Sequence, residues 1–248
     1  MSADANDGLG RRDFLAMSMA ALGAVLLAPG IRVIEIAGAR APEQAASTHV
    51  RWGLLIDTNK CASGCDDCVK ACATENAIKS CGHPRTDAQW IRKLELKDLR
   101  SGRRHSLPVM CQHCEHPPCV EVCPTGASFK RADGIVLVDR HICIGCRYCM
   151  MACPYKARSI VFEDVADQNP DVPRGRGCAE ACTLCVHRVD REQQPACIEA
   201  CAKAGHDAMI FGDLNDPQSE IAQRVAKYAS TQIRADLQLN PGVRYQGL

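Results

Sequence analysis

The sequence predicts an α+β fold of short β-hairpins and small helices, in which clustered cysteines occupy the centre of the core. Cysteine accounts for 18 of the 248 residues, whereas aromatic residues make up only 4%, so few large rings are available to fill a core. Sixteen of the cysteines fall into four runs of four, and each run ends in C-x3-C. This repeated unit indicates internal duplication.

The two middle runs have the most specific spacing. The third run reads C-x2-C-x2-C-x3-C-P, and the second differs from it by a longer gap before its third cysteine. In bacterial ferredoxins this spacing places three thiolates on one [4Fe–4S] cluster and the fourth on a neighbouring cluster. A single C-x2-C would favour zinc or thiol redox chemistry, but two complete runs that close in Cys-Pro favour iron–sulfur clusters. The candidate ligands are Cys111, Cys114, Cys119, Cys123, Cys143, Cys146, Cys149 and Cys153.

The two outer runs depart further from this pattern. The first has one additional residue in its first gap, which Ser63-Gly64 can absorb as a bulge because glycine tolerates unusual backbone angles. Alternatively, one cysteine of this run is not a ligand, which would leave a three-iron cluster or an empty site. The last run has eleven residues between its second and third cysteines. The candidate ligands of the outer runs are Cys61, Cys65, Cys68, Cys72, Cys182, Cys185, Cys197 and Cys201.

Cys81 and Cys178 lie outside the four runs. They are compatible with one disulfide, with two free thiols, or with substitution for a ligand in a loosened run. A disulfide scaffold of an exported protein would also use an even number of cysteines. Disulfides, however, do not require repeated C-x3-C endings.

Between the runs the sequence predicts short strands joined by turns. Stretches rich in β-forming residues predict strands at 51–58, 89–98, 158–162 and 208–212. A turn at 100–103 returns the second of these toward Leu107, and 129–138 is predicted to form a hairpin around Asp133-Gly134. Residues 169–177 are expected to form a loop rich in proline and glycine.

The C-terminal segment, 213–248, is predicted to contain a helix followed by an extended tail. Asp216 is expected to cap this helix, with Pro217 at its first position and its end near Ala229. The polar residues beyond it are expected to extend along a partner or along the protein's own surface.

Residues 1–39 predict an export signal, and residues 40–248 the folded domain. Arg11-Arg12 precede Asp13-Phe14-Leu15 in a twin-arginine motif, an apolar run follows, and Ala37-Gly38-Ala39 offers a cleavage site. The twin-arginine route exports proteins already folded around their cofactors. We therefore expect a periplasmic protein, with the signal either removed or retained as an anchor.

Several other functions find no support in the sequence. The formal net charge is +1, which does not favour nucleic-acid binding. There is no C-x2-C-H motif for covalent haem and no phosphate-binding glycine loop. No nucleophile and base are arranged for substrate chemistry. The side chains beside the runs are expected to pack or hydrogen-bond near a cluster, or to lie on a solvated face: His113, His116, His187, Arg147, Lys156 and Arg158.

The order of the runs, the last run CTLCVHRVDREQQPACIEAC and the phrase MIFGDLNDPQSE after it resemble the four-cluster ferredoxin-type subunits of respiratory membrane complexes. These include the polysulfide, dimethyl sulfoxide and nitrite reductase systems. The resemblance covers about residues 50–243. The twin-arginine signal and the CASGCDDC insertion are most similar to the DsrO-type subunit of the DsrMKJOP complex of sulfur-metabolising prokaryotes.

The resemblance implies a tandem bacterial-ferredoxin-like fold of two 2[4Fe–4S] modules. The inner module, about 105–160, is inserted between the runs at 61–72 and 182–201. It also implies four ligand sets, each holding one of four [4Fe–4S] clusters. Set 1 is Cys61, Cys65, Cys68 and Cys201; set 2 is Cys72, Cys182, Cys185 and Cys197; set 3 is Cys111, Cys114, Cys119 and Cys153; set 4 is Cys123, Cys143, Cys146 and Cys149.

The function implied is electron transfer without a substrate-converting site. The expected partners are an NrfD-type, quinone-reactive integral-membrane subunit, through which the protein is bound to the inner membrane, and a multihaem cytochrome c of a DsrMKJOP-like complex. The metabolic setting implied is sulfur-compound oxidation or reduction. The alternative is the electron-transfer subunit of a molybdopterin reductase of the polysulfide, dimethyl sulfoxide or nitrite reductase type. A zinc or disulfide scaffold is the alternative from a different class.

Overall fold

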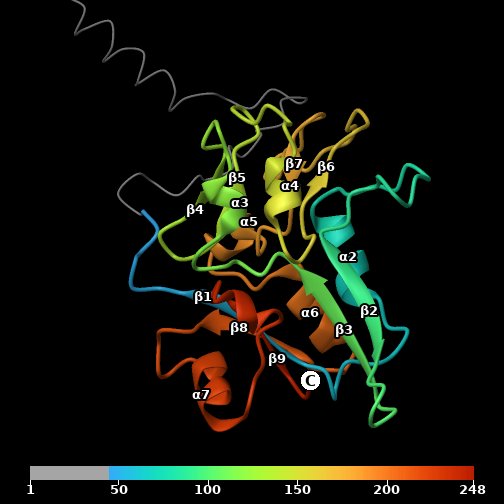
Figure 1. Ribbon diagram of the computed structural model, residues 1–248, viewed down its shortest axis with the longest axis vertical. Helices are drawn as coiled ribbons and strands as arrows, with labels where there is room; N and C mark the ends of the chain where they lie inside the picture. Colours follow the sequence, from blue (N-terminus) through green and yellow to red (C-terminus); the bar gives the residue numbers. More distant parts are fainter. Residues whose placement is uncertain (1–44) are drawn as a thin grey trace, which may run out of the picture. The chain divides into compact units, whose positions relative to one another are not determined.

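A three-stranded sheet carries the longest stretch of buried aliphatic residues in the part of the chain that the computed structural model describes, residues 45–248 (Figure 1). Its central strand, β1 (Trp52–Asp57), pairs antiparallel with β8 (Met209–Asp213) and parallel with β9 (Val243–Gln246). Leu54, Leu55 and Ile56 are at most 2% exposed. Their continuous apolar run is typical of a strand covered on both faces.

The remaining elements are short and mix helix with strand, as the predicted α+β class requires. The other strands are β2 (Ile91–Lys97), β3 (Arg104–Met110), β4 (Ser128–Lys130), β5 (Val136–Val138), β6 (Ser159–Ile160) and β7 (Ala179–Glu180). The helices are α2 (Asp67–Glu75), α3 (Pro118–Glu121), α4 (Tyr148–Ala152), α5 (Val186–Val189), α6 (Ala196–Lys203), α7 (Glu220–Lys227) and the 3-10 turn η2 (Ala235–Leu237).

The predicted hairpins are confirmed. Strands β2 and β3 pair antiparallel over seven residues each, through the turn expected near residues 100–103. Strands β4 and β5 form the second hairpin, in which the Gly134 N–H donates to the Arg131 carbonyl at 3.0 Å. The predicted strand at 158–162 is shorter than expected, because only β6 pairs with β7 there.

The predicted start of the C-terminal helix is wrong. Helix α7 begins at Glu220, and its cap is Ser219, whose side chain accepts a hydrogen bond from the Ala222 N–H at 3.2 Å. Asp216 instead forms a turn in which its carboxylate accepts from the Gln218 N–H at 2.9 Å. Aspartate and serine are both favoured at helix N-caps. Because Asp216 belongs to the turn after β8, Ser219 is the residue that stands at the start of the helix.

The C-terminal residues also contribute to the core. Strand β9 lies against β1, and its Val243 and Tyr245 are at most 1% exposed. The Tyr245 hydroxyl donates to the Pro108 carbonyl at 3.1 Å and accepts from the Gln112 side chain at 3.3 Å. The end of the tail is therefore a buried strand that contacts β1 and β3, rather than a segment along the surface.

Helix pairs rather than large sheets organise the rest of the fold. Helix α2 contacts α6, and α3 contacts α4 (Figure 1). Within residues 45–248, none of the helices is long and apolar enough to cross a membrane. The predicted signal at residues 1–39 lies outside the described residues.

Candidate iron–sulfur cluster sites

The four cysteine runs share one backbone feature. In each run the residue immediately before the second cysteine has a positive φ: Gly64 at 76°, His113 at 44°, Gly145 at 68° and Leu184 at 53°. A left-handed residue turns successive N–H groups inward, a geometry found at anion and iron–sulfur sites. The first run keeps this turn at Gly64 despite its inserted residue, which is compatible with the bulge considered from the sequence.

Helices α2 and α6 bring together cysteines that are far apart in the sequence. Cys68 and Cys72 lie on α2, and Cys197 and Cys201 lie on α6, all of them buried. The C-x3-C spacing places two thiols about one helical turn apart. Each helix therefore contributes one cysteine to set 1 and one to set 2.

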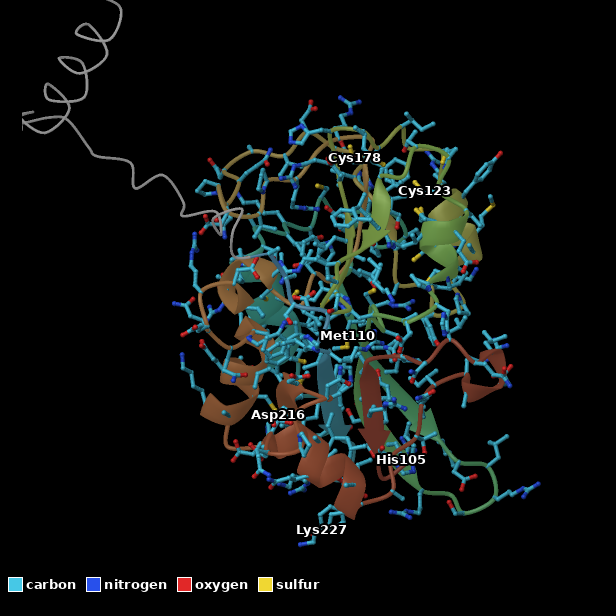
Figure 2. The ribbon with its side chains drawn as sticks, turned by 90° about the vertical axis from the view of Figure 1, so that its left-hand side faces the viewer. His105, Met110, Cys123, Cys178, Asp216 and Lys227 are labelled. Carbon is cyan, nitrogen blue, oxygen red and sulfur yellow. The ribbon has the colours of Figure 1, made fainter. Side chains whose placement is uncertain are left out.

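Helices α3 and α4 repeat this arrangement with the inner runs. Cys119 lies on α3 and Cys123 directly after it, while Cys149 lies on α4 and Cys153 at its end. Figure 2 shows Cys123 beside the green and yellow helical segments that correspond to α3 and α4. This pair of helices contributes to sets 3 and 4 as α2 and α6 contribute to sets 1 and 2.

Three separate cavities are each lined by one complete set. All four cysteines of set 4, of set 2 and of set 3 line the corresponding cavity. The same donor set, repeated at three places, is what three copies of one group would require.

Set 1 is brought together by the inserted loop. The charges of Cys61, Cys65 and Cys201 act on the Cys68 thiol, and with burial they raise its pKa to about 11. The Lys93 ammonium donates to the Cys61 sulfur at 3.1 Å and to the carbonyls of Ala62 and Cys65 at 3.1 and 3.0 Å. Lys93 thus closes the loop that carries the insertion.

The buried thiols are poorly suited to exist as thiolates without a cation. Burial, together with neighbouring thiols, raises the pKa of Cys111 and of Cys114 to about 12. A metal centre reverses this effect because its positive charge stabilises the thiolate form. Among the described residues no group of three metal-binding side chains is arranged for a single metal ion. In a cubane each thiolate binds a separate iron, so the cavities and donors fit a [4Fe–4S] group.

Several groups already donate hydrogen bonds to the candidate ligand sulfurs. The Ser128, Ala179 and Ala208 N–H groups donate to the sulfurs of Cys123, Cys143 and Cys201 at 3.3, 3.4 and 3.4 Å. The Asn76 side chain donates to the Cys72 sulfur at 3.5 Å. Such donors favour the anionic form of sulfur and tune cluster potentials.

The three histidines beside the runs have different surroundings. His113 is 1% exposed, and its Nδ1 accepts from the Val136 N–H at 3.0 Å. Burial, with the charges of Arg158 and Arg51, lowers the pKa of His113 to about 3, so the imidazole is neutral. His187 pairs with Glu75, and His116 is exposed. Hydrogen bonding and packing, as expected, describe His113 and His187.

The two cysteines outside the runs do not form the disulfide considered above. Both are free thiols. Cys81 is exposed, whereas Cys178 is half-buried and donates to the Arg140 carbonyl at 3.3 Å. The N–H of the next residue, Ala179, donates to the Cys143 sulfur of set 4 at 3.4 Å. Cys178 therefore lies beside set 4 (Figure 2), and the sequence carried no signal for this position.

The sets follow one another in a definite order. The α2–α6 pair joins set 1 to set 2, and the α3–α4 pair joins set 3 to set 4. Met110 lines the cavity of set 2, and the next residue, Cys111, lines that of set 3. All cysteines of sets 2 and 3 are buried, whereas Cys146 of set 4 is exposed, and Cys61 and Cys65 of set 1 are half-buried. The two outer sets thus approach the surface.

An ion-pair network that sequence reasoning missed fixes the helices around set 2. Glu75, at the end of α2, pairs with His187 Nε2 at 2.7 Å and Arg188 Nη1 at 3.0 Å, both on α5. Arg188 also pairs with Glu199 on α6 at 2.5 Å. Burial would raise the pKa of Glu75, but the hydrogen bonds from His187 and Arg188 outweigh it and hold this pKa below its usual range.

We predict that Glu75→Gln lowers stability at neutral pH and has less effect in acid. A lowered carboxyl pKa contributes stability that is complete above the ordinary value of 4.5 and is lost as pH falls through the folded-state value. The loss should be about 1–3 kcal/mol, or a few degrees in melting midpoint. Melting curves of variant and wild type from pH 7 to 3.5 measure it.

The matched control is Asp167→Asn, which removes the exposed pair of Asp167 with Lys79 and should change little. An Asp167→Asn loss as large as that of Glu75→Gln would contradict the prediction. A deficit of Glu75→Gln that does not depend on pH would contradict it as well.

Comparison with known proteins agrees with this site. The 4Fe-4S dicluster domain family matches residues 104–214. The Hdr-like menaquinol oxidoreductase iron–sulfur subunit 1 of Archaeoglobus fulgidus is 40% identical, over 97% of this chain and 98% of its own length. One subunit of the tetrathionate reductase of Salmonella typhimurium is 35% identical over 90% of this chain and 84% of its own length.

A third relative extends this pattern. The menaquinone reductase iron–sulfur cluster-binding subunit of Nitratidesulfovibrio vulgaris is 34% identical over 73% of this chain and 82% of its own length. The identity to all three exceeds 30% over more than two thirds of each chain. The chain therefore belongs to the family of ferredoxin-type [4Fe–4S] iron–sulfur subunits of respiratory oxidoreductase complexes.

Proposed function

We propose that this protein is an electron-transfer subunit that holds four [4Fe–4S] clusters, one on each of sets 1 to 4, in two tandem two-cluster modules. The observation that carries the proposal is that three separate cavities are each lined by the four cysteines of one set. Lys93 and the loop turn at Gly64 support a complete set 1. The leftover thiols are not needed as ligands.

The chain's residues give the proposed electron path two accessible ends. Bound clusters would accept and release single electrons. The protein buries sets 2 and 3, which excludes water and unwanted oxidants, and it leaves a cysteine of set 4 exposed. Electrons would enter and leave at sets 1 and 4, and no substrate bond would be made or broken.

We predict about sixteen iron and sixteen acid-labile sulfide per chain in anaerobically purified protein. Cys114→Ser should remove or convert one cluster, with a loss of up to a quarter of the iron, because Cys114 is buried in the set 3 cavity. The control, Cys81→Ser, changes an exposed thiol outside the sets and should keep all of the iron.

The outcomes of this measurement are distinct. About twelve or fifteen iron in the wild type would locate an empty or three-iron site, which we expect at set 1. Zinc without sulfide under anaerobic conditions would overturn the proposal in favour of a zinc scaffold. Equal iron loss in Cys81→Ser and Cys114→Ser would overturn the ligand assignment.

The surface around set 4 supports a protein partner at that end. Four exposed large apolar side chains lie within five residues of the exposed Cys146 in the sequence: Ile142, Ile144, Tyr148 and Met151 are 48, 67, 53 and 66% exposed. Exposed apolar groups gathered in this way mark interaction sites. We propose that this surface, the set-4 patch, docks the NrfD-type, quinone-reactive membrane subunit, and that a multihaem cytochrome c belongs to the same DsrMKJOP-like complex.

We predict that Ile144→Glu with Met151→Glu abolishes co-purification of an integral-membrane subunit from detergent-solubilised membranes while the iron content stays unchanged. Leu99→Glu is the control, since Leu99 is 91% exposed and lies in the turn between β2 and β3. Membrane-subunit recovery equal to wild type in the double variant would reject the set-4 patch as the docking surface.

The proteins that co-purify with the wild type also decide the metabolic setting. We propose sulfur-compound metabolism and a DsrO-type role, which recovery of an NrfD-type subunit with a multihaem cytochrome c would support. Two relatives act on a quinol or a quinone by name, and one is part of a tetrathionate reductase. Recovery of a molybdopterin subunit would favour the alternative, the electron-transfer subunit of a molybdopterin reductase.

We further propose that the protein is exported to the periplasm by the twin-arginine route and is held at the inner membrane by its partners. Replacing Arg11 and Arg12 by lysine should leave the cluster-loaded protein in the cytoplasm, as fractionation of cells would show. Arg32→Lys, in the same segment but outside the motif, should be exported normally. Export of the twin-lysine variant equal to wild type would contradict this proposal.

A further inference from the structure

Arg158 is a buried cation beside the cysteines of set 3. It is 5% exposed, and its Nη2 donates to the Cys119 sulfur at 3.2 Å and to the Ser128 hydroxyl at 2.9 Å. Its Nη1 is buried and has no hydrogen-bond partner. Within residues 45–248 no aspartate or glutamate forms an ion pair with it. Burying an unpaired charge costs several kcal/mol, so the site requires an anion.

The groups that face this guanidinium belong to two different sets. Arg158 lines the cavity of set 3 together with all four cysteines of that set. Ser128, whose hydroxyl accepts from Arg158, lines the cavity of set 4, and its N–H donates to the Cys123 sulfur of that set at 3.3 Å. Helices α3 and α4, which carry Cys119 and Cys149, contact each other. Arg158 therefore lies where sets 3 and 4 meet.

We propose that Arg158 is the shared counter-ion of sets 3 and 4 and that its buried charge makes these two sets easier to reduce. The inference rests on the proposed function, since four thiolates around a [4Fe–4S] core carry net negative charge, which grows on reduction. A fixed cation in a low-dielectric interior stabilises that added charge far more than one in water. Arg158 is thus a positioning and tuning residue, and it forms no bond to the iron.

The other sets have different electrostatic surroundings. Beside set 2, Glu75 and Arg188 form an ion pair at 3.0 Å, so their opposite charges offset each other. Set 1 has Lys93, which is only half-buried. Lys156, two residues before Arg158, is exposed to water. The buried charge of Arg158 therefore distinguishes the electrostatic surroundings of sets 3 and 4 from those of set 2.

Redox titration of the full-length protein, followed by electron paramagnetic resonance, tests the proposal. Arg158→Gln removes the charge and keeps an amide donor. Two of the cluster components should become about tenfold harder to reduce, a shift of 59 mV for a one-electron couple, while the others stay unchanged. Arg158→Lys keeps the charge and should retain most of the wild-type potential.

Lys156→Gln is the matched control, because it removes the same charge from the same loop at an exposed position. It should leave all midpoint potentials unchanged. Wild-type potentials in an Arg158→Gln protein with full iron would overturn the counter-ion role. An equal shift in Lys156→Gln would overturn it too, because it would show that burial is irrelevant.

Iron content gives a second measurement if assembly fails. Loss of iron in Arg158→Gln with retention in Arg158→Lys would support a counter-ion needed for cluster binding. Loss in both variants would overturn the role of charge in favour of shape alone. A wild type without iron and sulfide would reject the proposed function itself, and the wild-type assay separates that result from failure of this inference.

Discussion

The structure depends on the burial of thiols that repel one another as anions. Eleven of the candidate ligand cysteines are buried, and burial raises the pKa of Cys111 and Cys114 to about 12. Strands of two to seven residues and helices of four to nine cannot by themselves enclose such groups stably. The positive charge of a bound metal centre would stabilise these buried cysteines as thiolates at the centre of the core. Folding is therefore expected to be coupled to cluster loading.

The same left-handed turn before the second cysteine recurs in all four runs, so one backbone conformation serves all four candidate sites. Gly64 and Gly145 adopt positive φ without strain, whereas His113 and Leu184 do so with a Cβ atom, at a cost of about 1–2 kcal/mol each. The inserted residue of the first run is absorbed before this turn, so the geometry around Cys65 follows that of the other runs. The four runs thus share one backbone turn, whereas the residue that makes this turn differs among them.

Local signals in the sequence were sufficient for much of this architecture. The strand of 51–58, both hairpins and the cysteine runs follow from alternation, turn residues and spacing. The cap at Ser219 and the packing of Tyr245 depend on where distant segments meet, and no short pattern encodes those contacts. Likewise, Arg147, Lys156 and Arg158 look equivalent in the sequence, and only Arg158 is buried in the fold.

That difference shows how a fold with four similar cysteine loops can acquire a direction for electrons. If four clusters sat on the four loops in identical surroundings, their potentials would be similar, and electrons would have no preferred position among them. The side chains between the sets break this equivalence: a neutral amide from Asn76 at set 2, a half-buried ammonium from Lys93 at set 1, and a buried guanidinium from Arg158 between sets 3 and 4. Because a charge acts more strongly in the interior than at the surface, the buried arginine has the largest effect. Sets 3 and 4, the pair that includes the exposed Cys146, would thus attract electrons from set 2. The preferred electron position would then lie at the end of the row of sets that carries the set-4 patch.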